Sequence, residues 1–490
     1  MGHGLLPRAV FTVRKGSAVF RKASHRNAGL MLLVNLVAAS LPVLAQESLP
    51  LAPGYRGEIR RGADGKLTVL PEAESAGQQR SANAAPGEPM VVGNGAVSRG
   101  AGPRPEIPAK PAHAGPPDMS CLSSGTALSP AERALVKMPA DSWMSLPGTA
   151  FRTFCKAHEI SALEGSGGCV MAINAWSGGV FDERLRKMLV IGGGHMDYWG
   201  NEVYGFDLAS GAWTMVKPAS RLGKATGPTE PMPDGNPVSR HTYDGLAFMR
   251  HLSQVFMFGG ATSPNGYSVN STWWFDSANG SWRAKGNAPP SGVGHYYMGA
   301  AYDPVTRMVY VRDESAFFAY DPDTDRWSGP IVNFGYQSLS RMKTYNYRRA
   351  VIMPAQRLFL VAGGVLKNPA APDVFIYHLD SKRDVTADYP MSGDTSVISV
   401  GAPGLDADLR TGSLVAWAGG APAIMDPATW NWRRGSARGA PAQAVGNGTF
   451  GRFRYIPYLN VFILVNRPDD DVHFYKLTPG CGSRDEAMPR

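Results

Sequence analysis

The stretch MLVIGGGHMDYWGNEVYGFDLASGAW, residues 188–213, decides the fold. Its first apolar run, residues 188–191, ends on three glycines, and a polar and aromatic segment follows at residues 195–201. A second apolar run ends at Asp207, and Trp213 follows six residues later. The pattern predicts two strands and the start of a third, linked by tight turns. Glycine suits the first turn because a Cβ would disfavour the backbone conformations that such a turn uses.

The same arrangement recurs further along the chain. Apolar runs that end on Gly-Gly or a polar residue are followed by a second run, in most copies ending on Asp, and usually by a Trp. These first runs lie at residues 254–260, 307–313, 357–364, 413–420 and 461–466. Repeats with this strand content predict an all-β chain of four-stranded blades around an axis, a β-propeller. We expect six blades, or seven if residues 150–175 or the insertion at residues 218–239 form another.

The last repeat indicates how the ring closes. After Leu477 the chain reaches Pro479 and Cys481 without an outer strand. Residues 142–149, SWMSLPGT, look like an outer strand with its Trp, and no inner strands precede them. We therefore expect this N-terminal strand to complete the last blade. On these repeats the chain resembles kelch-type β-propellers over about residues 140–480, which implies kelch-like blades.

The first 120 residues differ in composition from the rest of the 490-residue chain. Residues 29–45 are apolar, follow a basic segment and end in small residues, which predicts a signal peptide over residues 1–45. The alternative is an uncleaved membrane anchor at residues 29–45. Residues 46–120 are rich in Ala, Gly, Pro and Ser and are predicted to be a disordered linker. The propeller is expected over residues 121–485, in a secreted or periplasmic protein.

Charge and cysteines narrow the function classes. The net charge is +9, but residues 1–46 carry six positive side chains and no acid, which leaves +3 for the rest. So small a net charge on the rest of the chain does not indicate nucleic-acid binding. An even number of cysteines in an exported chain predicts disulfides. The favoured pairing joins Cys155 to the nearby Cys169, and Cys121 to Cys481, which would tie the start of the folded region to its end.

Polar and aromatic side chains fall at comparable places in successive blades. Loops that leave the inner strands of a propeller line one mouth of the axial channel, so we expect these side chains there. Each also has a structural interpretation, since a histidine after Gly-Gly can bond a neighbouring blade and tyrosines at strand starts are often core residues. The candidates are His195, Asp197, Tyr198, Asn201, Arg240, His241, Tyr243, His295, Tyr296, Tyr297, Arg312, Arg341, Tyr345 and Arg348.

Such a set suits the cleavage of uronic-acid polysaccharides by β-elimination. That reaction removes the C5 proton beside a carboxylate and needs a cation near the developing charge. Histidine or tyrosine can take the proton, either can protonate the leaving oxygen, and arginine matches the carboxylate. Aromatic faces would carry the sugar rings. The remaining candidates would bind substrate.

At these residues the sequence also resembles the propeller-fold polysaccharide lyases, of which ulvan lyases are the familiar case. Those enzymes use two His, a Tyr, an Arg and a further Tyr in chain order. The corresponding catalytic residues here are His195, His241, Tyr296, Arg312 and Tyr345. The resemblance implies that His241 or His195 is neutraliser and base, Tyr296 base and acid, and Arg312 the carboxylate clamp.

Two other functions remain open. A non-catalytic propeller that binds glycan or protein at a cell surface would use the same fold. A copper radical oxidase similar to galactose oxidase would need a cysteine joined to a tyrosine, whereas disulfides account for the four cysteines here. No cofactor is indicated; a zinc or calcium site that uses His195 and Asp197 stays an alternative, for which the His-x-Asp pattern alone is a weak signal. The expected partner is a polysaccharide or cell-surface glycan.

Overall fold

The computed structural model describes residues 57–61, 67–71, 127–158, 165–220, 230–288, 295–334, 347–364 and 374–481. The chain divides into two units, Met1–Pro103 and Arg104–Arg490. In the first unit, strands β1 (Gly57–Arg61) and β2 (Leu67–Pro71) pair antiparallel, within the segment predicted as a linker. The predicted signal peptide, residues 1–45, lies outside the described residues.

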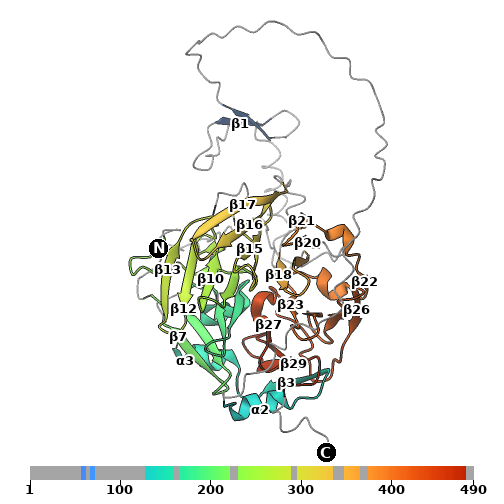
Figure 1. The fold of residues 1–490 in the computed structure, drawn as a ribbon. Helices are drawn as coiled ribbons and strands as arrows, with labels where there is room; N and C mark the ends of the chain where they lie inside the picture. The colour runs from blue at the N-terminus through green and yellow to red at the C-terminus, as the bar shows by residue number, and fades with distance from the viewer. Residues whose placement is uncertain are drawn as a thin grey trace, which may run out of the picture. The chain divides into compact units, whose positions relative to one another are not determined.

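The second unit is a six-bladed β-propeller, and each blade contains four antiparallel strands (Figure 1). Blade 1 consists of β4 (Gly178–Asp182), β5 (Lys187–Ile191), β6 (Val203–Asp207) and β7 (Ala212–Lys217). Blade 2 consists of β9 (Leu246–Met249), β10 (Gln254–Phe258), β12 (Thr272–Asp276) and β13 (Ser281–Lys285). Blade 3 consists of β14 (Gly299–Tyr302), β15 (Val309–Arg312), β16 (Ala316–Asp321) and β17 (Arg326–Asn333).

The second half of the ring repeats this order. Blade 4 consists of β18 (Arg348–Met353), β19 (Leu358–Gly363), β20 (Phe375–His378) and β21 (Arg383–Asp384). Blade 5 consists of β23 (Gly404–Ala407), β24 (Leu414–Trp417), β25 (Ala423–Met425) and β26 (Asn431–Arg434), with β22 (Ser392–Gly393) parallel to β26 at its edge. Blade 6 consists of β27 (Phe453–Ile456), β28 (Val461–Leu464), β29 (Val472–Lys476) and β3 (Ser142–Leu146).

Strand β3 closes the ring, as the sequence predicts. It pairs antiparallel with β29, so that Trp143 lies opposite Tyr475. The innermost strands contact one another in the order β4, β9, β14, β18, β23, β27 and back to β4. A closed ring leaves no blade without neighbours on both faces, and each blade can bury apolar side chains against the next.

The innermost strands follow a different sequence rule from the strands outside them. Their residues are small where neighbouring blades come closest to the axis. A Cβ added at Gly299 would lie 2.9 Å from the Cβ of Ala350, and one at Gly404 would lie 2.6 Å from the Cβ of Phe453. The apolar runs predicted from the sequence are instead the second and third strands, which are buried within the blades.

Helices occupy the segment in which a seventh blade was one alternative. These are α3 (Phe151–His158), the 3₁₀ helix η1 (Gly168–Val170) and α4 (Met171–Asn174). Helix α2 (Pro130–Val136) precedes β3, and its first turn is closed by a reciprocal capping box between Ser129 and Glu132. In the described segments, three further 3₁₀ helices lie between strands: η2 (Thr386–Asp388), η3 (Ser396–Ser399) and η4 (Phe450–Arg452).

A disulfide joins Cys155 in α3 to Cys169 in η1, which confirms the local pairing. Cys481 is also disulfide-bonded, and its predicted partner Cys121 lies outside the described residues. These bonds are compatible with an extracellular location. Among the helices of the described segments, none has the length and apolar character to cross a membrane.

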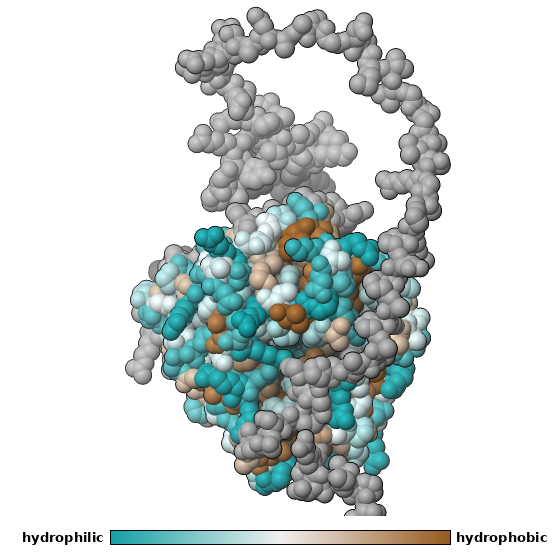
Figure 2. Space-filling view, viewed as in Figure 1, coloured by the Kyte–Doolittle hydropathy of each residue, from teal (hydrophilic) through white to brown (hydrophobic). Residues whose placement is uncertain are grey.

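Polar residues cover most of the propeller face seen in Figure 2, with smaller apolar patches between them. Among the residues whose burial is described, the exposed large apolar side chains are Met196, Tyr267, Val305 and Ile331. Scattered exposed apolar residues are ordinary on protein surfaces. Met196 and Tyr267, however, flank the candidate site described next.

Candidate functional site at one mouth of the propeller

The topology brings the predicted site residues to one mouth of the ring. Because the strands of a blade are antiparallel, the start of the first strand and the end of the second lie at the same end. His195 and Asp197 follow β5, and His241 precedes β9. Tyr296 precedes β14, Arg312 ends β15 and Arg348 begins β18. Arg341 and Tyr345 lie outside the described residues.

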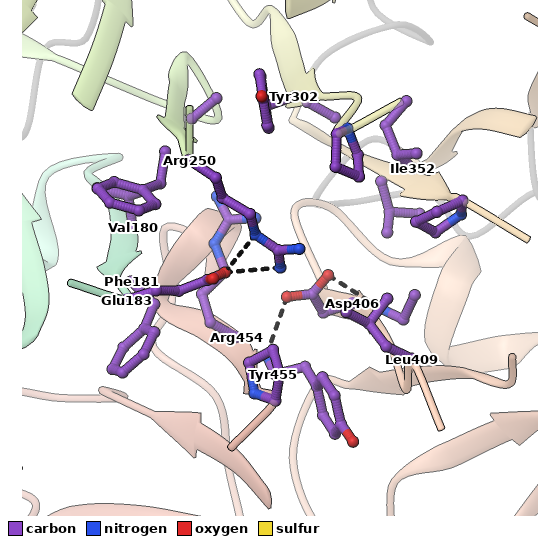
Figure 3. Close-up of a pocket in the computed structure, with 18 of the residues that line it drawn as sticks. Val180, Phe181, Glu183, Arg250, Tyr302, Ile352, Asp406, Leu409, Arg454 and Tyr455 are labelled. Carbon is purple, nitrogen blue, oxygen red and sulfur yellow. Dashed lines mark hydrogen bonds and ion pairs between the residues drawn. The ribbon is translucent and has the colours of Figure 1, made fainter. Parts of the chain in front are cut away.

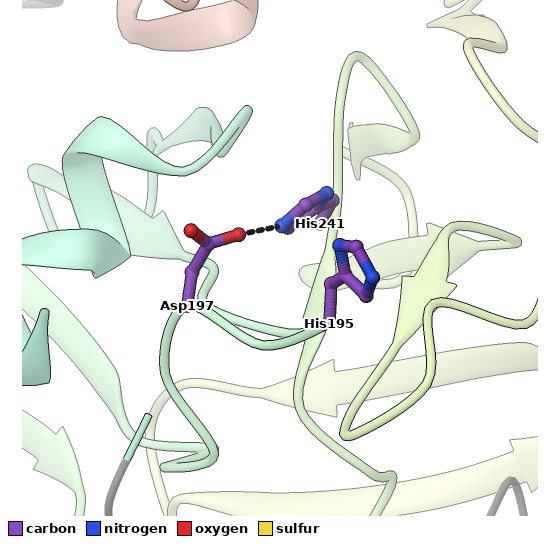
Figure 4. Close-up of side chains that lie close together, drawn as sticks. All are labelled: His195, Asp197 and His241. Atoms are coloured by element: carbon purple, nitrogen blue, oxygen red, sulfur yellow. Dashed lines mark hydrogen bonds and ion pairs between the residues drawn. The ribbon is translucent and has the colours of Figure 1, made fainter. Parts of the chain in front are cut away.

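Three of these side chains form a compact cluster, His195, Asp197 and His241 (Figure 4). His241 Nε2 lies 2.8 Å from Asp197 Oδ2. The two imidazole rings meet edge to face, with their centroids 5.8 Å apart. His241 is buried, whereas His195 and Asp197 are half-buried, so the cluster has one side toward solvent.

Glycines at two positions allow the loop that carries His195 to pack closely on its neighbours. Gly194 has φ +79°, and a Cβ there would overlap the backbone of Arg240 and His241. The loop that carries His195 therefore packs directly on β8 (Arg240–His241), which pairs with β11 (Ala261–Thr262). On the other side, a Cβ at Gly266 would lie 2.6 Å from Cδ2 of His195. Both closely packed turns thus require residues without side chains.

A collar of aromatic residues lies beside the cluster. Its members lie one to three residues before innermost strands, and each has a positive φ, between 45° and 62°. Ring centroids are 5.0 Å apart for Tyr243 and Tyr297 and 4.9 Å apart for Tyr297 and Tyr347. The aromatic collar consists of Trp176, Tyr243, Tyr297, Tyr347 and Phe450.

The aromatic collar contacts the cluster through His241. The ring of Trp176 lies 5.0 Å from that of His241, and Tyr243 Oη lies 3.4 Å from His241 Nδ1. Trp176 and Phe450 were not predicted from the sequence. A usable signal for Trp176 was present, because an aromatic residue stands two positions before a glycine in WSG, YDG and YMG, at residues 176–178, 243–245 and 297–299.

Burial favours the uncharged forms of the ionisable groups at this mouth. It lowers the pKa of His241, although the hydrogen bond and charge of Asp197 act in the opposite direction. It also raises the pKa of Tyr243, and the neighbouring Tyr297 adds to that shift. Burial likewise raises the pKa of Tyr297, followed in importance by Tyr347. The mouth therefore presents a neutral imidazole and neutral phenols.

Tyr296 is connected to His195 through a turn. Its hydroxyl donates to the carbonyl of Gly266 and accepts from the amide of Ser268, each at 2.9 Å. Gly266 is also the residue against which the His195 ring lies. The side chain of Tyr267, which lies between Gly266 and Ser268 in the chain, is 54% exposed. An exposed ring at this position could carry a sugar face, and the sequence alone did not single it out.

Several predicted binding residues make structural contacts. Tyr198 is fully buried and its hydroxyl donates to Glu202 at 2.6 Å. The Asn201 amide donates to the carbonyl of Pro237 at 2.9 Å. Arg240 is ion-paired with Glu230 and donates to the carbonyl of Gly259. These contacts fix the loops that carry the histidines, and a role in binding substrate stays a prediction.

The remaining predicted residues lie between blades 2, 3 and 4. His295 is buried and its Nδ1 lies 2.9 Å from Asp313. The Arg312 guanidinium stacks on Phe334, 3.5 Å from its ring centroid. Arg348 is also buried. Next to Arg312, burial and then Asp313 raise the pKa of Glu314 to about 7, and this carboxyl group was not identified from the sequence.

The opposite mouth contains a separate cavity of about 120 Å³ (Figure 3). It lies between the far ends of the innermost strands. Glu183 and Arg250 form an ion pair there at 2.6 Å, and Arg454 donates to the carbonyls of Gly179 and Leu246. Of the predicted site residues that the structure describes, none lines this cavity.

No family model matches this chain, and no curated protein matches it.

Proposed function

We propose that this propeller is an exported, kelch-like polysaccharide lyase that cleaves uronic-acid polymers by β-elimination at the His195 mouth. The observation that carries the proposal is the gathering of His195, Asp197 and His241 beside the Tyr296 hydroxyl in a partly open mouth. Residues separated by about a hundred positions meet there because blades 1, 2 and 3 are consecutive neighbours around one axis.

The reaction needs a base and an acid on neighbouring groups. A base removes the C5 proton, the electron pair forms a C4–C5 double bond, and the C4–O bond breaks. The leaving oxygen then receives a proton. We assign the proton transfers to Tyr296 and a histidine of the cluster, because Tyr296 and His195 flank the same turn at Gly266. Tyr267, exposed on that turn, offers an aromatic face to a sugar ring.

The substrate carboxylate must also be neutralised. The lyase resemblance assigns this role to Arg312, whose guanidinium stacks on Phe334. Because this guanidinium is buried, we propose that the substrate carboxylate binds instead on the side of the mouth that holds His195 and His241. Tyr345, the fifth residue of the resemblance, lies outside the described residues and keeps its assignment from the sequence alone.

The copper radical oxidase alternative is less well supported. It requires a cysteine free to bond a tyrosine. Cys155 and Cys169 are joined to each other, and Cys481 is disulfide-bonded as well. None of these three is available for that chemistry.

The test is a screen of uronic-acid polymers for the ultraviolet absorbance of the unsaturated uronate. We expect product with at least one polymer, and a loss of about 10²- to 10⁴-fold in rate for His195→Ala. His251→Ala is the matched control, because His251 lies at the opposite mouth and also faces a carboxylate, that of Asp323. Polymer binding without product would instead favour the non-catalytic glycan-binding propeller.

A further inference from the structure

We infer that His195, Asp197 and His241 bind one divalent transition-metal ion, for which zinc(II) is the natural probe. The inference goes beyond the proposed function, since a metal site at these residues needs no particular reaction. Two imidazoles and one carboxylate are a donor set that proteins use for zinc and for iron(II).

The geometry is close to that of a bound site. One ligand atom from each of the three residues lies within 4.8 Å of the others. Two atoms that each lie about 2.1 Å from a common ion are at most about 4.2 Å apart. Side-chain movements of ångström scale therefore bring the three atoms around one ion. Asp197 and His241 already meet at 2.8 Å, so the largest movement falls on His195.

The backbone around the ligands is fixed by hydrogen bonds. The amide of Asp197 donates to the carbonyl of Gly194 at 3.0 Å, and its carbonyl accepts from Gly167. The indole of Trp199 donates to the carbonyl of His195 at 3.0 Å. Ligands held in this way lose little conformational freedom when an ion binds.

An outer partner for the ligand His241 is also in place. Its Nε2 faces Asp197, and its Nδ1 faces the hydroxyl of Tyr243 at 3.4 Å. A histidine that ligates a metal through one nitrogen commonly bonds a neighbour through the other. When an ion binds Nε2, the imidazole proton can reside on Nδ1 and point to Tyr243.

Other His–Asp pairs of this protein provide an internal comparison. His251 pairs with Asp323 at 3.2 Å, and His295 pairs with Asp313 at 2.9 Å. Across the described part of the chain, a third ligand joins such a pair only at His195, Asp197 and His241. A histidine needs only one aspartate as a hydrogen-bond partner, so the second histidine of this cluster is not explained by hydrogen bonding alone.

The open side of the cluster indicates what the ion would do. His195 and Asp197 are half-buried, so three protein ligands would leave a coordination position for water or substrate, as in catalytic rather than structural zinc sites. With the lyase function, on which this step rests, the ion would neutralise the uronate carboxylate. The ion would then place a cation at the histidines themselves, whereas the Arg312 guanidinium is buried against Phe334.

The experiment measures zinc(II) binding to the full chain after treatment with a chelator. Calorimetry is paired with metal analysis after dialysis, and cobalt(II) serves as a second probe whose visible spectrum reports histidine ligation. We expect one ion per chain. His241→Ala and Asp197→Ala should each weaken binding by more than about 100-fold, since even outer partners contribute about 10- to 100-fold. His251→Ala should bind as wild type.

A circular dichroism melt of each variant shows whether it folds. The conservative variant Tyr243→Phe removes only the outer partner, and should weaken binding by about 10-fold while the fold is kept. Zinc should also raise the melting temperature of wild type and not that of Asp197→Ala. Absence of stoichiometric binding in folded wild type would overturn the inference, and so would equal binding by His241→Ala. Neither readout depends on lyase activity, so the two proposals fail separately.

Discussion

Gly194 shows how one residue without a side chain determines the site. The turn that carries His195 has a positive φ at Gly194 and lies on the backbone of β8, which carries His241. From the sequence, backbone conformation explains the glycines at this turn. The structure adds a second reason, since there is no room for a Cβ.

Gly194→Ala should therefore destabilise the propeller by about 2–4 kcal/mol, from backbone strain together with the overlap at Arg240 and His241. Gly235→Ala separates the two causes. Gly235 has a similar φ of +81°, but a Cβ added there would have nothing within 4 Å. That control should cost only about 1–2 kcal/mol. Chemical unfolding measures both, and equal losses would show that the close packing contributes nothing.

The raised pKa of Glu314 should make the free energy of unfolding depend on pH. Burial, reinforced by Asp313, raises its pKa from 4.5 to about 7 in the folded state. The folded protein thus retains a proton that the unfolded chain has released, and stability falls as pH rises from about 4.5 through 7. Glu314→Gln removes this loss and should stabilise the protein at pH above 7 by up to about 3 kcal/mol.

Urea unfolding of wild type and Glu314→Gln at acidic and alkaline pH checks this sign. The two should be similar at low pH and diverge as pH rises. A variant whose stability falls with pH as steeply as that of wild type would show that Glu314 does not titrate in this range.

At the scale of the strand, β3 closes the ring by pairing with β29. Trp143 is buried and packs on Tyr475 and Trp417, with ring centroids 5.0 and 6.2 Å apart. Trp143→Ala should lower the free energy of unfolding by about 3–5 kcal/mol. It should also loosen β29, the blade 6 strand that pairs with β3. Trp327→Ala is the matched control, because Trp327 lies on the outer strand of blade 3, whose four strands are continuous in sequence.

Hydrogen exchange distinguishes the two variants. Trp143→Ala should reduce the protection of β29 amides, whereas Trp327→Ala should leave β29 protected. Loss of protection at β29 in both variants would show that the whole ring unfolds as one unit and that β3 has no special role in closure.

How well a strand could be predicted from the sequence depended on its position within the blade. The second and third strands of each blade, such as β5 and β6, are apolar runs bounded by glycine or aspartate and could be predicted directly. Innermost strands such as β14, with sequence GAAY, have small residues because blades crowd at the axis, and small residues give no apolar signal. Blade 4, the copy without its Trp, has an outer strand of only two residues, β21.

At the scale of the whole molecule, the packing of consecutive blades around one axis creates the site. His195 and His241 belong to neighbouring blades, and Tyr296 precedes a third. Repeat position was enough to predict a shared mouth. It was not enough to separate side chains that face the mouth from those that bond the scaffold, such as Arg240 with Glu230. That distinction depends on tertiary partners, as does the stacking of Arg312 on Phe334.

The two mouths also differ in chemistry. One holds histidines, a carboxylate and the aromatic collar, and the other holds a cavity lined by ion-paired groups such as Glu183 and Arg250. We place the reaction at the first mouth. A substitution at the second mouth should therefore leave the rate of the reaction unchanged.

The most direct test compares two tyrosines on a uronic-acid polymer that wild type cleaves. Tyr296 lies beside His195, and Tyr302 lines the cavity at the opposite mouth. We predict that Tyr296→Phe slows formation of the unsaturated uronate by about 10²-fold or more, while Tyr302→Phe cleaves at the wild-type rate. An unchanged rate in folded Tyr296→Phe, or an equal loss in Tyr302→Phe, would contradict the proposed lyase site.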